Sequence, residues 1–144
     1  MSLNTTLLQS SLGLVLENEQ NLTLRFYEIL FERYPQVKRL FGRKSQAEQA
    51  KMLQEALVSV VDRLEDGEWV SSTLEAMGHT HVDYEVTEEM YPMVGECLIL
   101  ALKDLSGDAW TQEMEKAWGD AYAAISGLML AGAHKRLLVE AGKA

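Results

Sequence analysis

The sequence contains very little cysteine and proline. Cys97 is the only cysteine among 144 residues, which excludes an internal disulfide and any metal or redox motif built on paired cysteines. A single cysteine suits a reducing compartment, so we expect a cytoplasmic protein. Proline occurs only at Pro35 and Pro92, with no Ser/Gly-rich linker between them. Because nothing marks a second domain, we expect one domain over residues 1–144.

Basic residues and long hydrophobic runs are also scarce. Lys and Arg number 13 against 22 Asp and Glu, for a formal net charge of −9. Such a surface repels polyanions and no Lys/Arg cluster offsets it, so we do not expect a nucleic-acid partner. The N-terminal stretch MSLNTTLLQSSLGLVLENE lacks a basic start and is interrupted by polar residues. We therefore expect neither a signal peptide nor a membrane helix.

Helical periodicity dominates what is present. Apolar residues recur at helical spacing in nearly every long segment, and strand signals are scarce, so the sequence predicts an all-α fold. Pro35 should end one helix and leave a short helical continuation, VKRLF. The next helix is expected over residues 47–66, closed by DGEW, with Leu53 and Leu57 on its inner face. Thr87 is expected to cap a helix that runs through Leu102.

One helix carries a histidine on its apolar face. Spacings of four, three and four place Val70, Leu74, Met77 and His81 on one stripe. A buried imidazole costs free energy unless its nitrogens are used, so His81 needs a partner. That partner is either a protein group, such as a backbone carbonyl, or a metal.

Four separated motifs give a more specific indication. FYEILFERYPQVKRLF, the helix that carries His81, MYPMVGECL and KAWGDAYAAI resemble, in this order and spacing, the bacterial globins of the flavohaemoglobin and single-domain haemoglobin type. The resemblance extends over almost the whole chain. It implies a globin fold, about six to eight helices around a haem pocket, and haem b (iron protoporphyrin IX) as cofactor.

On the proximal side, the resemblance implies that His81 is the haem ligand and that Tyr91 supports it. His79 lies two positions away, about 200° around a helix, and should face solvent or the haem edge. His134 should be a solvated residue. The family places a glutamate beside this tyrosine, but the matching position here is Ala133. Glu140 is the available substitute.

On the distal side, the resemblance implies that Phe41 packs against haem and that the Tyr27 hydroxyl donates a hydrogen bond to bound O2. Tyr27 bonded to a backbone carbonyl is the alternative. Aligning AKMLQEAL by its leucines makes Gln49 the second distal donor, whereas an ungapped count from Phe41 selects Lys51, which points away from the leucine face. The remaining residues that should enclose porphyrin or support His81 are Leu53, Leu57, Val86, Tyr91, Val94, Leu98 and Tyr122.

The resemblance leaves three functions open. The first is reversible binding of O2 and of other diatomic gases, NO and CO. The second is nitric oxide dioxygenation, which requires electrons and hence a separate reductase, and which the absent glutamate makes less favourable. The third is a haem-based gas sensor or an interaction module. A haem-free helical bundle would yield a colourless protein.

Overall fold

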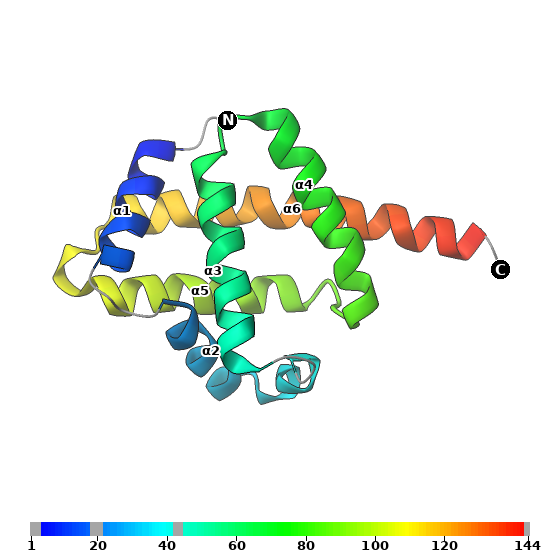
Figure 1. Ribbon diagram of the computed structural model, residues 1–144, viewed down its shortest axis with the longest axis horizontal. Coiled ribbons are helices and arrows are strands. Elements are labelled where there is room, and N and C mark those ends of the chain that lie inside the picture. The colour runs from blue at the N-terminus through cyan, green and yellow to red at the C-terminus, as the bar shows by residue number, and fades with distance from the viewer. Residues whose placement is uncertain (1–3, 18–21, 42–44, 143–144) are drawn as a thin grey trace.

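The structure is a computed structural model that describes residues 4–17, 22–41 and 45–142. These ranges are mostly helical and contain no strand (Figure 1). The elements in chain order are α1 (Thr5–Glu17), α2 (Leu22–Arg33), η1 (Pro35–Phe41), α3 (Gln46–Asp62), α4 (Gly67–His81), η2 (Val82–Tyr84), α5 (Met90–Ser106), η3 (Gly107–Ala109) and α6 (Gln112–Gly142), where η denotes a 3₁₀ helix. The predicted all-α fold is confirmed.

The helices pack as crossed pairs. Figure 1 shows α5 and the long α6 running roughly along the long axis of the molecule, with α3 running across both of them and α4 crossing α6 obliquely. The most extensive contacts are between α4 and α6 and between α2 and α5. The last turns of α6 project beyond the other helices (Figure 1). Within the described ranges, no helix combines the length and the apolar composition that a membrane span requires.

Local sequence signals set several helix ends. Pro35 follows the end of α2 and begins η1, as the sequence predicts for a residue that cannot continue a helix. The Ser45 hydroxyl caps α3 by accepting a hydrogen bond from the Glu48 amide at 3.1 Å. Such a cap satisfies one of the amides that the first turn leaves unpaired.

Two predicted boundaries are wrong. The segment DGEW does not close α3; Asp66 caps α4 by accepting from the Trp69 amide, and Gly67 begins that helix. Thr87 does not cap α5, which begins at Met90, and Thr87 contributes only its backbone carbonyl to the Met90 amide. The later start places Pro92 in the first turn, where the missing amide hydrogen costs nothing.

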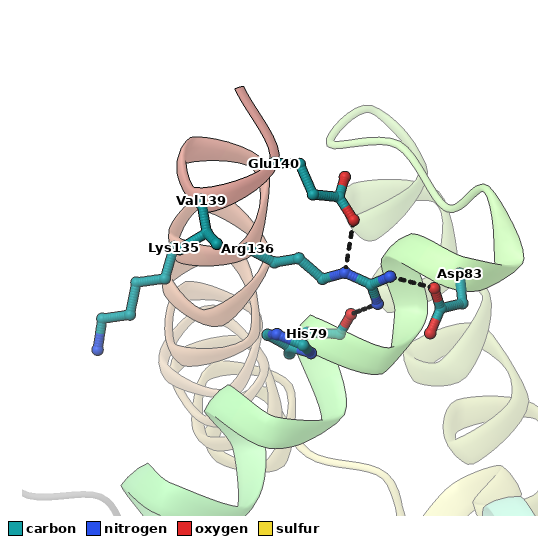
Figure 2. A pocket seen from close by; sticks show the side chains of 6 residues that line it. All are labelled: His79, Asp83, Lys135, Arg136, Val139 and Glu140. Carbon is teal, nitrogen blue, oxygen red and sulfur yellow. Dashed lines mark hydrogen bonds and ion pairs between the residues drawn. The ribbon is translucent and has the colours of Figure 1, made fainter. Parts of the chain in front are cut away.

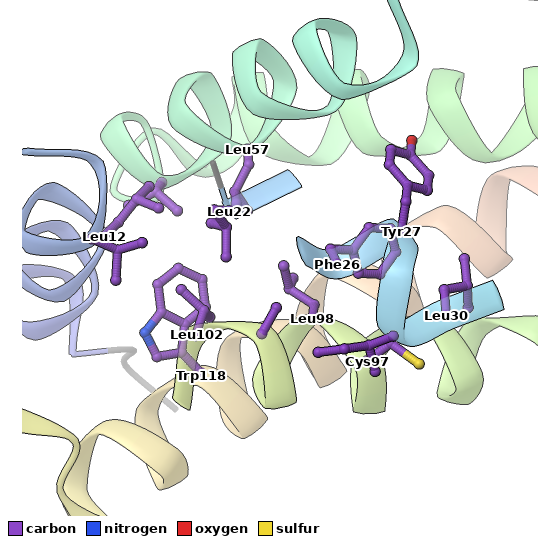
Figure 3. Close-up of a cluster of buried hydrophobic side chains, with 14 of the residues drawn as sticks. Leu12, Leu22, Phe26, Tyr27, Leu30, Leu57, Cys97, Leu98, Leu102 and Trp118 are labelled. Atoms are coloured by element: carbon purple, nitrogen blue, oxygen red, sulfur yellow. The ribbon is translucent and has the colours of Figure 1, made fainter. Parts of the chain in front are cut away.

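The core has two clusters of buried side chains. The larger lies where α1, α2, α3, α5 and α6 meet and includes Leu12, Phe26, Tyr27 and Trp118 (Figure 3). Inside it, the Trp118 indole Nε1 donates to the Ser11 hydroxyl at 3.0 Å, which joins α6 to α1. The smaller cluster consists of Val60, Val70, Leu74, Tyr91 and Met129 and lies beneath α4. It fixes the helix that carries His81.

Candidate functional site

His81 is the last residue of α4, one turn after Met77, which packs against the smaller core cluster. Val70 and Leu74 on its stripe are buried, whereas Met77 and His81 are only half-buried. The stripe therefore leaves the core as the helix approaches its end. The imidazole is placed at a boundary between the interior and an open cavity, instead of within closely packed side chains.

One ring nitrogen of His81 is bound and the other is free. Nδ1 lies 2.6 Å from the Met77 carbonyl oxygen, and since a carbonyl only accepts, Nδ1 is the donor. Nε2 then carries the lone pair and forms no hydrogen bond with another described residue. Burial lowers the pKa of His81, although the hydrogen bond to Met77 opposes the effect. A neutral imidazole with a fixed tautomer and an available nitrogen is the form that binds metals.

A cavity of about 590 Å³ opens between α3 and α4. From α4 and η2 its wall includes Ala76, Met77, Thr80, His81 and Tyr84, and α3 contributes Met52. Sequence reasoning missed Met52. It lies one turn after Gln49 and next to Leu53, so the alignment that selected those two would also have placed it at the pocket edge. Of the candidate ligand and distal residues named from the sequence, His81 lines this cavity; Tyr27, Phe41 and Gln49 are not among its described lining residues.

Tyr27 lies in a cluster of four aromatic rings. Its ring centroid is 5.0 Å from that of Phe26, 5.7 Å from Phe31 and 5.4 Å from Phe41. The structure thus brings together Tyr27 and Phe41, two residues that the resemblance assigns to one pocket. Figure 3 shows the Tyr27 hydroxyl directed away from the side chains of Leu30 and Cys97.

The Tyr27 hydroxyl is a protonated donor. Burial raises its pKa to about 12, so the proton stays on the oxygen at neutral pH. The hydroxyl forms no hydrogen bond with another described residue, which leaves it available to an acceptor from outside the described chain. The alternative of a bond to a described backbone carbonyl is not observed.

The first half of α3 carries both alternatives for the second distal residue. Gln49 is half-buried and Lys51 is exposed. Leu53 and Leu57 pack with the larger core cluster, to which Tyr27 also belongs. Gln49 is thus the less exposed of the two alternatives, four residues before Leu53 and on the same helical face, and Lys51 is open to solvent.

A hydrogen bond joins Tyr122 of α6 to Tyr91 of α5. The Tyr122 hydroxyl donates to the Tyr91 backbone carbonyl at 2.5 Å. The Tyr122 ring lies against Gly95, where a Cβ would be 2.4 Å from Cε2 of the ring. Tyr122 thus supports the first turns of α5. Of the other residues expected here, Val86 packs on the smaller cluster, and Val94 and Leu98 belong to the larger one.

The Tyr91 side chain has a buried, unpaired hydroxyl. It is 6% exposed and its oxygen has no hydrogen-bond partner among the described residues. Ala133 is buried and supplies no carboxylate. Glu140 does not substitute, because its Oε1 accepts from Nε of Arg136 at 3.0 Å and the residue lines a different cavity (Figure 2). Desolvation raises the pKa of Tyr91, so the unpaired oxygen stays protonated.

The two other histidines, His79 and His134, lie outside the cavity that His81 lines. His79 is exposed and lines a cavity of about 480 Å³ between the end of α4 and α6 (Figure 2). His134 is also exposed, with Nε2 3.8 Å from a Glu88 oxygen. Their surface positions agree with the sequence-based expectation.

These features fit haem better than a metal held by protein alone. Among the described residues no group of three His, Cys, Asp or Glu side chains is arranged to bind a metal. A single histidine ligand suffices when a porphyrin supplies the other four in-plane nitrogens. His81 offers that nitrogen, and the aromatic and aliphatic side chains around Tyr27 offer apolar surface.

Known globins and flavohemoproteins are similar to this chain in sequence. A sequence model of the globin family matches residues 24–129. The chain is 30% identical over 128 residues to a flavohemoprotein of Oceanobacillus iheyensis. The matched region covers 88% of this chain and 32% of that protein. It is 35% identical over 118 residues to an uncharacterized globin-like protein of Aquifex aeolicus. That match covers 80% of this chain and 81% of the other. The chain thus spans less than a third of the flavohemoprotein's length.

Two solved structures are also similar. A bacterial globin from Campylobacter jejuni superposes with a TM-score of 0.79 at 32% identity, covering 91% of this chain and 94% of that one. An engineered carbene transferase, described as a putative nitric oxide dioxygenase from Rhodothermus marinus, gives a TM-score of 0.79 at 26% identity. That match covers 95% of this chain and 93% of the other.

Proposed function

This chain belongs to the globin family, and from that premise we propose that it holds haem b through His81 and reversibly binds O2. Haem binding itself follows from the family and from the flavohemoprotein relatives. The iron of bound haem supplies the coordination site for a diatomic gas, O2, NO or CO. The residues of this chain supply the ligand nitrogen, the apolar enclosure and the hydrogen-bond donors.

The hydrogen bond between His81 and Met77 carries this proposal. By donating Nδ1–H to the carbonyl at 2.6 Å, the ring presents Nε2 outward from α4. A fixed second nitrogen also prevents rotation of the ring and raises its basicity. The assignment of His81 as the ligand therefore rests on chemistry as well as on the alignment.

Tyr27 and Gln49 are proposed as the groups that retain O2. Bound O2 acquires partial negative charge, so it accepts hydrogen bonds from a protonated hydroxyl and a side-chain amide. The Tyr27 side chain is buried, and its hydroxyl has no other described partner. Two donors in an apolar pocket slow ligand loss, and we expect high O2 affinity with slow dissociation.

Absorption spectra of the purified protein with added hemin test the proposal. We expect stoichiometric haem uptake and, after reduction, five-coordinate iron that binds O2 in a long-lived form. His81→Ala should abolish this spectrum, and His79→Ala and His134→Ala are matched controls that should retain it. A colourless protein that takes up no hemin contradicts the proposal, as does a His81→Ala variant with an unchanged spectrum.

Nitric oxide dioxygenation is the second candidate. It is supported by the similarity to flavohemoproteins and to the putative nitric oxide dioxygenase of Rhodothermus marinus. In this reaction NO and O2 combine to nitrate, and one electron must return to the site before the next turnover. We propose that a separate reductase supplies it. Sustained nitrate formation with an added reductase would support this activity, whereas a single turnover despite the reductase would contradict it.

A further inference from the structure

Arg136 of α6 reaches across to the end of α4 (Figure 2). Its Nη1 donates to the His79 carbonyl oxygen at 3.0 Å, its Nη2 donates to the Asp83 carboxylate, and its Nε donates to Glu140 at 3.0 Å. The side chain is only 20% exposed. All three guanidinium nitrogens therefore donate hydrogen bonds, and two of the three acceptors belong to the segment around His81.

The contacts of Arg136 bracket His81. The His79 carbonyl lies two residues before it and Asp83 two residues after it. The last carbonyls of a helix have no partner within the helix, and a cation at this end is favoured by the helix dipole. Donation to His79 satisfies one of these carbonyls. Donation to Asp83 holds η2, after which Glu85 turns the chain with a left-handed φ of 63°.

We infer that Arg136 is a positioning residue for His81. It does not contact the imidazole. It anchors the backbone on both sides of His81, so that the ring keeps its hydrogen bond to Met77 and Nε2 keeps one direction. The consequence for haem rests on the proposed function, whereas the consequence for the ring orientation does not.

Its neighbour Lys135 offers a matched control. Lys135 also joins α6 to α4, through an ion pair with Glu75, but its side chain is 71% exposed and its partner lies six residues before His81. Loss of this pair removes one cross-helix contact without touching the segment around His81. Exposed pairs of this kind contribute little to stability.

The first measurement uses the haem-free protein. The ¹⁵N chemical shifts of the His81 ring report how fully Nδ1 is protonated. We expect one dominant tautomer in the wild type and in Lys135→Gln, and a shift toward a mixture in Arg136→Gln and Asp83→Asn. Arg136→Lys keeps the charge but not the fork, and should give an intermediate shift. Wild-type shifts in both Arg136→Gln and Asp83→Asn would overturn the inference.

The second measurement uses the haem-loaded, reduced protein. The iron–histidine stretching band should broaden and move in Arg136→Gln and keep its wild-type position in Lys135→Gln. A merely structural role for Arg136 predicts a lower melting temperature with an unchanged band, and that result would overturn the inference. If the wild type shows no such band, the proposed ligand fails, while the tautomer measurement still decides the role of Arg136.

Discussion

Gly78 of α4 lies directly against the backbone of Met129 in α6, so closely that a Cβ at Gly78 would be 1.8 Å from the Met129 carbonyl oxygen. Gly132 repeats the relationship in the opposite direction, with a Cβ position 1.9 Å from the Glu75 carbonyl oxygen. Only hydrogen fits at either place. The two glycines let α4 and α6 cross at backbone distance, which brings the end of α4 within reach of Arg136.

Replacement of Gly78 by alanine should therefore be costly. The added methyl must displace backbone atoms, and overpacking of this kind costs about 1–3 kcal/mol. Urea unfolding measures the loss. Gly127→Ala is the matched control, because that glycine lies in α6 with no atom within 4 Å of its Cβ position. The control should stabilise by about 0.5–1 kcal/mol. Equal stability of the two variants would contradict the close crossing.

Tyr27→Phe should change ligand release far more than stability. The ring stays in its aromatic cluster, and the hydroxyl has no described partner to lose. Loss of one hydrogen bond to bound O2, worth about 1 kcal/mol, should speed dissociation roughly 5- to 10-fold. Stopped-flow O2 release measures it. Tyr34→Phe removes a hydroxyl bonded to Glu96 and serves as control. An unchanged rate in Tyr27→Phe would show that Tyr27 is not the distal donor.

Tyr91→Phe should leave the haem-free protein at least as stable as the wild type. The hydroxyl is buried with no described partner, so its removal relieves a desolvation penalty of about 1–3 kcal/mol instead of breaking a bond. Thermal unfolding of both proteins without haem provides the comparison. Destabilisation by more than about 1 kcal/mol would mean that this oxygen has a partner in solution.

Ser11→Ala should destabilise the larger core cluster. The serine hydroxyl accepts from the Trp118 indole at 3.0 Å, and both side chains are buried. Alanine would leave the indole N–H unpaired, at a cost of about 1–3 kcal/mol. Denaturant unfolding tests this. Ser10→Ala is the control, since that hydroxyl is exposed and its one partner among the described residues is the Leu7 carbonyl. Similar stabilities for the two variants would contradict the prediction.

Local and periodic signals predicted much of the fold. The helical spacing of apolar residues gave the all-α class, and Pro35 correctly marked the end of α2 because a proline cannot continue a helix. The same reasoning failed at Thr87 and at DGEW. Capping residues are common in turns, and which one begins a helix depends on the direction in which the chain leaves the preceding element.

The sequence by itself determined the helical class, the family resemblance and the face on which His81 lies, because spacing along a helix fixes the direction of a side chain. Contacts between distant segments could not be read in this way. Only the tertiary structure decided that Arg136 binds the backbone beside His81 and that Met52 lines the same cavity. It also decided that Glu140 pairs with Arg136 and that Gly78 packs against the Met129 backbone. Each depends on the crossing of helices far apart in the chain, which no local pattern records.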